Sequence, residues 1–338
     1  MKKFIFCFSL ISFLFCSAKV SGQERVQSDA AIRQARQTAS TGTGAFRSYQ
    51  RFIDNDSVNW IKGGDASLTF AATNLANWAA GGEDQIGMRA GVNLFANYKK
   101  GKRTFENYAT IAYGILKTGE RKGVKNDDRL HYTSKLGHQI SPKFAYTGAL
   151  VARTQMAPGY RYAGDEIVAK LSDFLAPINL YLSVGMDYMP TPNISVMLSP
   201  VMGRATYVRS DSSTVIIAAG MMTTKTDADG KQIQVPMKAR HDFGGGALIK
   251  FNGNLFSNRI AYTSQLDLFS NYLNKPENIE ILWTFNARMI LYRNITADWQ
   301  LTLRYDDNQK TVDPETGNLK GAKIQTRVFT GIGLKYQF

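Results

Sequence analysis

The C-terminal stretch at 323–338, KIQTRVFTGIGLKYQF, has a period of two. One set of alternate positions is apolar or weakly polar: Ile324, Thr326, Val328, Thr330, Ile332, Leu334, Tyr336 and Phe338. The other set, from Lys323 to Gln337, is mostly charged, amide or glycine. Strict alternation places the two sets on opposite faces of one β-strand. An apolar face of this length is deep enough to cover the hydrocarbon layer of a bilayer.

The same alternation recurs along the chain, most clearly at 86–98, 178–188, 279–292 and 295–306. We identify twelve such segments, which start near 58, 86, 103, 128, 143, 178, 193, 239, 257, 279, 295 and 322. An open sheet in lipid would leave a row of unpaired backbone groups, so the sheet must close on itself. The pattern predicts an all-β fold, a closed antiparallel transmembrane β-barrel of twelve strands, an even number as in bacterial outer-membrane barrels.

The connections between these segments alternate in length. The connections at 99–103, 141–143, 190–193, 254–258 and 293–295 are short. Those at 74–85, 118–127, 157–177, 208–238, 272–278 and 308–321 are mostly longer. With both chain ends in the periplasm, this sorting predicts short periplasmic turns and long extracellular loops. Within the loops, 166–175 is predicted to be an amphipathic helix, and the apolar run at 216–222 is expected to pack on the barrel mouth or on another protein.

Residues 1–22 read as a cleaved secretory signal, with Lys2 and Lys3 followed by an apolar run. A lipoprotein signal at Cys16 is disfavoured because Phe15 occupies a small-residue position. The leader contains both cysteines, so the mature chain has no disulfide or thiolate zinc site. Residues 23–57 form a polar N-terminal segment, either a periplasmic tail or a plug of the lumen, and 58–338 form the barrel. The mean hydropathy of −0.24 excludes a helical membrane bundle.

The chain carries a formal net charge of +14. A basic protein binds nucleic acid, anionic lipid or other anions. The secretory leader makes nucleic acid an unsuitable partner, so we expect outer-membrane lipids, including lipopolysaccharide, as partners. The final strand, ending in the aromatic Phe338, resembles the signal read by the outer-membrane assembly machinery.

An ordered set of motifs includes LANWAAGG (75–82), DDRLHYTSKLGH (127–138) and MLSPVMG (197–203). This set resembles an uncharacterised outer-membrane family of Bacteroidota, domain of unknown function 3078. The family positions are Asn77, Trp78, Gly81, Gly82 and Pro200. The resemblance implies a barrel in the outer membrane and brings no catalytic residue.

The alternation predicts which charged side chains point into the lumen. The basic candidates are Arg89, Lys135, Arg153, Lys250, Arg288, Arg304 and Arg327, and the acidic ones are Asp187, Asp242, Asp267 and Asp298. Charges inside a narrow barrel must be paired or hydrated. Two interpretations stay open, an ion-pair network that fills the interior and a narrow, anion-preferring pore.

The three histidines, His131, His138 and His241, have no metal-ligand spacing. His138 and Ser134 share the outer face but lie about 13 Å apart along a strand, too far for a nucleophile and its base. Asp127 and Asp128 beside His131 are interpreted as a solvated rim, because a protease site would need a facing partner. We therefore expect no catalytic residue, metal or cofactor.

Three functions follow, in order of preference. The first is a narrow channel or solute-binding barrel in the cell outer membrane with a net basic lumen. The second is a non-conducting structural or accessory subunit of a larger outer-membrane complex for assembly or nutrient uptake, in contact with other outer-membrane proteins. The third is an outer-membrane lipid hydrolase.

Overall fold

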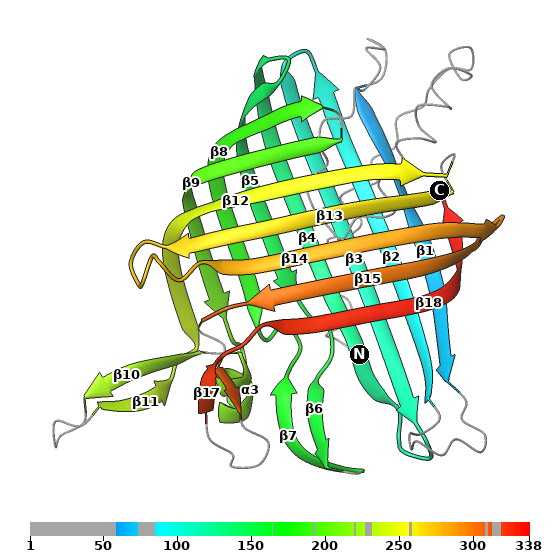
Figure 1. The fold of residues 1–338 in the computed structure, drawn as a ribbon. Helices are drawn as coiled ribbons and strands as arrows, with labels where there is room; N and C mark the ends of the chain where they lie inside the picture. Colours follow the sequence, from blue (N-terminus) through cyan, green and yellow to red (C-terminus); the bar gives the residue numbers. More distant parts are fainter. Residues whose placement is uncertain are drawn as a thin grey trace.

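The computed structural model describes residues 59–73, 85–163, 165–191, 193–219, 221–226, 232–256, 259–307, 310–312 and 319–338. The fold is a closed antiparallel barrel of twelve strands, which confirms the prediction. Its strands are β1 (Trp60–Thr73), β2 (Gln85–Lys100), β3 (Arg103–Thr118), β4 (Val124–Ser141), β5 (Phe144–Thr154), β8 (Ile178–Thr191), β9 (Ile194–Tyr207), β12 (Ala239–Leu255), β13 (Ile260–Asn271), β14 (Glu280–Tyr292), β15 (Ile295–Tyr305) and β18 (Gln325–Gln337). Consecutive barrel strands are neighbours, and β1 pairs with β18 to close the ring (Figure 1).

The two ends of the barrel differ. At the end where β1 begins and β18 ends, the strands are joined by tight turns such as 101–102 and 142–143; we call this the turn end. At the other end, the loop end, long connections carry the hairpins β6 (Gly159–Ala163) with β7 (Glu166–Ser172), β10 (Met222–Thr226) with β11 (Gln232–Pro236), and β16 (Lys310–Val312) with β17 (Leu319–Ala322). The predicted sorting of short and long connections is therefore present.

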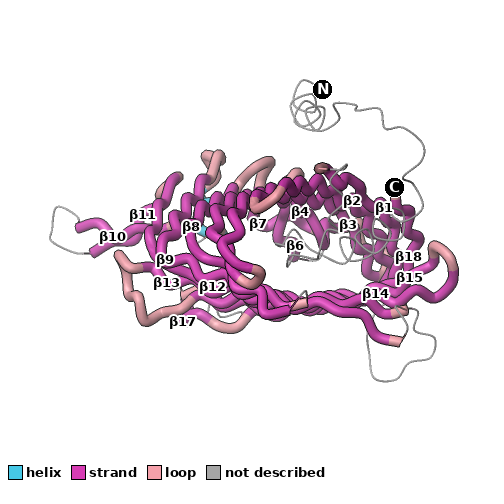
Figure 2. Tube along the Cα trace, turned by 90° about the horizontal axis from the view of Figure 1, so that it is seen from above, coloured by secondary structure: helices cyan, strands magenta, loops and turns pink. Residues whose placement is uncertain are grey.

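The barrel is flattened. Seen end-on, β2, β3 and β4 lie in one wall and β12 to β15 in the facing wall (Figure 2). The strands of the two walls run in clearly different directions (Figure 1). Strands twist relative to their neighbours, and the twist accumulates around a barrel. Because the walls are close, side chains from strands far apart in the ring meet inside.

The outer surface carries the apolar faces predicted from the alternation. Met88 on β2, Leu136 on β4, Leu182 on β8, Trp299 on β15 and Val328 on β18 are all more than a third exposed. Such a surface without a covering layer is what a lipid-facing barrel presents. Within the described ranges, no helix is long and apolar enough to cross a membrane.

The predicted helix at 166–175 is wrong. Residues Glu166–Ser172 form β7, which pairs with β6 and places Tyr162 opposite Ile167. The apolar spacing fitted a helix, but the adjacent strand and the intervening Gly-Asp at 164–165 favour a hairpin. The apolar run at 216–222 behaves differently. It overlaps α3 (Ser213–Ala218), whose Val215 and Ile216 pack with Ala176, Val208 and Met221 in a small buried cluster.

Pro200 lies within β9, a central strand, where a missing backbone N–H would normally break a ladder. The structure solves this with a bulge toward each neighbour. Ser199 and Pro200 oppose Gly185 of β8, and Pro200 and Val201 oppose Gly245 of β12. A bulge leaves its extra residue unpaired. The missing N–H of Pro200 therefore removes no hydrogen bond from the ladder, and the bulge bends β9 at this family position.

Candidate functional site in the barrel lumen

Asp127 on β4 is the centre of a cluster of charged side chains in the lumen. Its carboxylate lies 2.7 Å from Arg89, 2.9 Å from Arg129 and 3.1 Å from Arg327. Three guanidinium groups and one carboxylate leave an excess of positive charge at this point. The Arg89 guanidinium also lies over the Phe329 ring, 4.9 Å from its centroid. A guanidinium that faces an aromatic ring is held in a fixed plane.

Two ion pairs cross the lumen. Arg327 of β18 reaches Asp127 of β4, and Arg153 of β5 lies 3.7 Å from Asp267 of β13. In each pair the two strands are four places apart in the ring. The side chains therefore meet through the interior and not along one wall. These contacts divide the lumen near the loop end.

A second cluster near the loop end is built on Arg204 of β9. Its guanidinium lies 2.7 Å from Asp242 of β12 and 2.9 Å from the Glu280 carboxylate of β14. The same group lies 4.7 Å from the centroid of the Phe269 ring. Neither Arg204 nor Glu280 was among the predicted site residues. Both residues lie at positions that alternate with outward-facing side chains, and this alternation could have identified them as lumen residues.

The half of the lumen at the turn end is packed with polar side chains. Lys135 forms an ion pair with Asp187, which also accepts a hydrogen bond of 2.7 Å from the Ser195 hydroxyl. Lys335 lies 3.7 Å from Asp65, and the Lys135 and Asp187 side chains are 2% and 0% exposed. These side chains are shielded from bulk solvent, so each buried charge needs its partner.

Some of the lumen side chains near the loop end are partly exposed. The side chains of Arg153 and Asp267 are 27% and 28% exposed, and Arg327 is 40% exposed. Near the loop end the lumen thus has a partly exposed vestibule lined by arginines, and the turn end holds a tightly packed polar layer.

The remaining predicted lumen residues divide between these layers. Lys250 is buried on β12, Arg288 pairs with Asp298 between β14 and β15, and Arg304 lies 3.0 Å from Asp306 near the mouth. The structure therefore brings Arg89 and Arg327 together, and Arg153 with Asp267. It leaves Arg304 apart from both groups.

The expected solvated rim at Asp127 and Asp128 is wrong. The two carboxylates point to opposite faces of β4, as neighbours on a strand do. Asp127 faces the arginines inside, whereas Asp128 accepts hydrogen bonds of 2.8 Å from the backbone N–H groups of Met156 and Ala157. Lys125 donates to Asp128 and, over 2.7 Å, to the Ala157 carbonyl. Asp128 and Lys125 thus hold the loop that carries β6 and β7 against the barrel.

A separate ion pair at the loop end is exposed to solvent. Lys238 donates a hydrogen bond of 2.5 Å to Asp211. This bond and the lysine charge lower the pKa of the Asp211 carboxyl. Among the described residues, no group of three His, Cys, Asp or Glu side chains is placed to hold a metal ion.

His138, the candidate base of a lipid hydrolase, is exposed on the outer face of β4. Its register partners are Arg103 on β3 and Tyr146 on β5. Neither partner is a serine, and Ser134 lies four residues away on the same strand. The described strands therefore supply no serine beside His138 in the register.

The family positions Asn77, Trp78, Gly81 and Gly82, the leader at 1–22 and the segment at 23–57 lie outside the described residues. Residues 70–160 match the family described as "Protein of unknown function (DUF3078)". The predicted resemblance to this family is confirmed over that stretch. A comparison with curated proteins finds no match.

Several solved barrels are similar in outline. The translocator domain of autotransporter NalP from Neisseria meningitidis has 9% identity and a TM-score of 0.34, covering 92% of this chain and 97% of that chain. The NanC porin has 8% identity and a TM-score of 0.31, covering 81% and 98%. The Ralstonia pickettii toluene transporter TbuX has 12% identity and a TM-score of 0.30, covering 89% and 97%. At these scores the similarities carry no argument about the lumen.

Proposed function

We propose that this chain is an integral outer-membrane β-barrel whose lumen binds small anions and passes them through a narrow route. The observation that carries the proposal is the Asp127 cluster, in which three arginines share one carboxylate inside the barrel. The predicted leader, the closed barrel and its apolar outer surface support the outer-membrane location. The turn end, which carries both ends of the barrel, then faces the periplasm.

The vestibule provides the chemistry for anion capture. Asp127 orders the guanidinium groups and neutralises only part of their charge. Arginine donors in a fixed fork match the oxygen atoms of carboxylate and phosphate. Rings of arginine or lysine select anions in pores. An anion that enters from the loop end would displace the Asp127 carboxylate from Arg327, the most exposed of the three arginines.

The test is the conductance of the folded mature chain in a planar bilayer, with a salt gradient to read selectivity. We expect small, anion-selective steps. Arg89→Gln combined with Arg327→Gln should reduce the anion preference, because two of the cluster's three cations are removed. The matched control is Arg304→Gln, which removes a charge near the mouth outside the cluster. A non-conducting barrel in all these forms would refute the route.

A second function, a non-conducting accessory subunit of a larger outer-membrane complex, is favoured by the loop-end surface. Ile167 and Val168 on β7 and Ile217 on α3 are at least half exposed, and β7 packs beside α3. Apolar side chains grouped on a loop mark a protein contact. This function predicts that a partner co-purifies with the barrel and is lost when Ile167 and Val168 are changed to serine, while the barrel stays silent in the bilayer.

A further inference from the structure

The turn between β2 and β3 is strongly basic. The turn and the two strand ends beside it contain Lys99, Lys100, Lys102 and Arg103, and Gly101 with a φ of +54° makes the tight reversal. Lys62 on the neighbouring strand β1 is exposed on the outer face near the same corner. The outward-facing positions of β1, β2 and β3 in this half carry no acidic residue. This corner of the turn end therefore attracts anions.

An aromatic cluster lies directly beside the basic turn. Trp60 lies 5.2 Å from Tyr98 and 6.2 Å from Phe105, measured between ring centroids. Lys62 extends over the Trp60 ring, with its ammonium 5.5 Å from the centroid. Aromatic rings of this kind gather at the level of the lipid headgroups. The cluster marks the depth at which the phosphate layer meets this side of the barrel.

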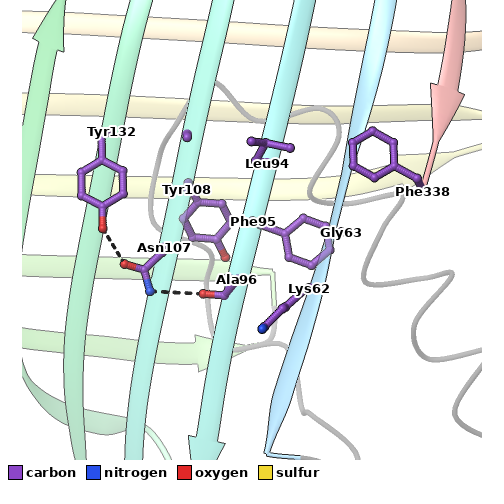
Figure 3. Close-up of a pocket in the computed structure, with 10 residues that line it drawn as sticks. Lys62, Gly63, Leu94, Phe95, Ala96, Asn107, Tyr108, Tyr132 and Phe338 are labelled. Atoms are coloured by element: carbon purple, nitrogen blue, oxygen red, sulfur yellow. Dashed lines mark hydrogen bonds between the residues drawn. The ribbon is translucent and has the colours of Figure 1, made fainter. Parts of the chain in front are cut away.

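Below the cluster, the outer wall is hollowed. The cavity has a volume of about 200 Å³ (Figure 3). Its lining consists of Lys62, Gly63, Leu94, Phe95, Ala96, Asn107, Tyr108, Ala109, Tyr132 and Phe338. The register places Ala96 opposite Asn107, and Ala109 opposite both Leu94 and Tyr132. The small side chains on β2 and β3 form the floor of the hollow. The larger ones on either side form its walls.

The polar groups of the hollow satisfy one another. The Tyr132 hydroxyl donates a hydrogen bond of 2.8 Å to Asn107 Oδ1, and Asn107 Nδ2 donates one of 3.3 Å to the Ala96 carbonyl (Figure 3). Unpaired polar groups are costly in hydrocarbon, whereas paired ones leave an apolar surface. The hollow is thus suited to a hydrocarbon chain although an asparagine lies in it.

We propose that this hollow holds one acyl chain of an anionic phospholipid of the inner leaflet, with the phosphate on Lys62 and the basic turn. Ala96 lies four residues from Lys100, roughly 13 Å along the strand. This spacing matches the distance between the headgroup of a phospholipid and the upper part of its acyl chain. The proposal rests on the outer-membrane placement given above, which turns this corner toward the phospholipid leaflet. Basic groups at the membrane surface favour lipids with a net negative headgroup.

The test is native mass spectrometry of the folded barrel in detergent, with phosphatidylglycerol and phosphatidylcholine of identical chains added in equal amounts. We expect preferential retention of phosphatidylglycerol. Ala109→Leu, which fills the hollow, should reduce its retention about tenfold. The control is Ala90→Leu, an exposed alanine on the outer face of β2 away from the hollow. Ala109→Val provides a milder filling, and circular dichroism checks the fold of every variant.

The headgroup is tested separately with Lys62→Gln, which should reduce phosphatidylglycerol retention about fivefold and leave phosphatidylcholine unchanged. Lys117→Gln, at the opposite end of β3, is its control. Equal retention in the Ala109 and Ala90 variants would overturn the chain site. Equal retention of the two lipids by the unmodified barrel would overturn the headgroup site. Lipid retention is measured without any ion flux, so this proposal can be tested on a barrel that never conducts. A barrel that conducts ions but retains no phosphatidylglycerol would refute the lipid site and leave the proposed channel function intact.

Discussion

At the scale of single residues, Asp127 decides how the arginines of the vestibule are held. It is 5% exposed and faces Arg89, Arg129 and Arg327 from three different strands, β2, β4 and β18. Without its carboxylate the three guanidinium groups repel one another in a partly desolvated space. The same residue therefore links the stability of the barrel to the charge of its lumen.

The first prediction concerns Asp127→Asn. We expect the free energy of unfolding to fall by about 2–3 kcal/mol, the lower range for breaking a buried ion pair, because Arg327 is partly hydrated. Urea unfolding of the refolded barrel measures the change. Asp211→Asn, which removes an exposed partner of Lys238, is the control and should leave the free energy of unfolding almost unchanged. Equal losses in the two variants would show that Asp127 does not hold the cluster.

The alternation of side chains predicts which face of the sheet Arg89, Arg153 and Arg327 occupy. It could not predict their partners, because Arg153 and Asp267 are joined only when the two walls approach. Asp127 was misread as a solvated rim because its place in the sequence suggested the barrel edge. The strand β4 begins at Val124, several residues earlier than predicted, and so carries Asp127 inside.

At the scale of elements, the double bulge at Pro200 shows how one strand is fitted between two neighbours. Gly185 and Gly245 face the extra residues of β9 from either side. A methyl group at Gly185 would lie 1.9 Å from the Leu198 carbonyl oxygen. Glycine is required here by the approach of the neighbouring backbone. The sequence marked Pro200 as a family position, but only the paired register explains it.

The second prediction follows for Gly185→Ala. We expect a loss of at least about 2 kcal/mol in unfolding free energy, because the clash is with backbone and the bulge must rearrange. Gly203→Ala on β9 is the control, since its methyl group would meet nothing within 4 Å of it. Its effect should stay within about 0.5 kcal/mol. Equal stability of the two variants in urea would contradict the register at the bulge.

The loop-end hairpins could not be predicted from the sequence pattern. The twelve barrel strands were predictable because each must alternate against lipid over its whole length. The segment of β7 has no lipid to face, and its apolar residues at 167, 171 and 174 fitted a helical period. What decides its structure is pairing with β6 and the tie from Lys125 and Asp128. Such contacts cannot be read from one segment alone.

At the scale of the whole molecule, closure and flattening create the site. The ring closes by pairing β1 with β18, and the two broad walls approach closely enough for opposite strands to share ion pairs (Figure 2). Neither strand of the Arg153–Asp267 pair contacts the other through the sheet. A measurable coupling energy between these two residues therefore shows that the two walls lie close together. A single substitution within one wall gives no such information.

The third prediction is a double-mutant cycle on this pair. Arg153→Met and Asp267→Asn should be coupled by about 0.5–1 kcal/mol in unfolding free energy, the range for partly exposed ion pairs. Arg153→Met with Asp211→Asn is the control cycle and should be additive, because the two groups share no partner.

In a planar bilayer, the Arg153–Asp267 double variant should conduct more than the parent, since the bridge that divides the vestibule is gone. Additivity in the first cycle would mean that the walls stand further apart and that the lumen is wider than the ion pairs indicate. Coupling without any change in conductance would leave the bridge as a structural tie and favour the accessory-subunit function over the anion route.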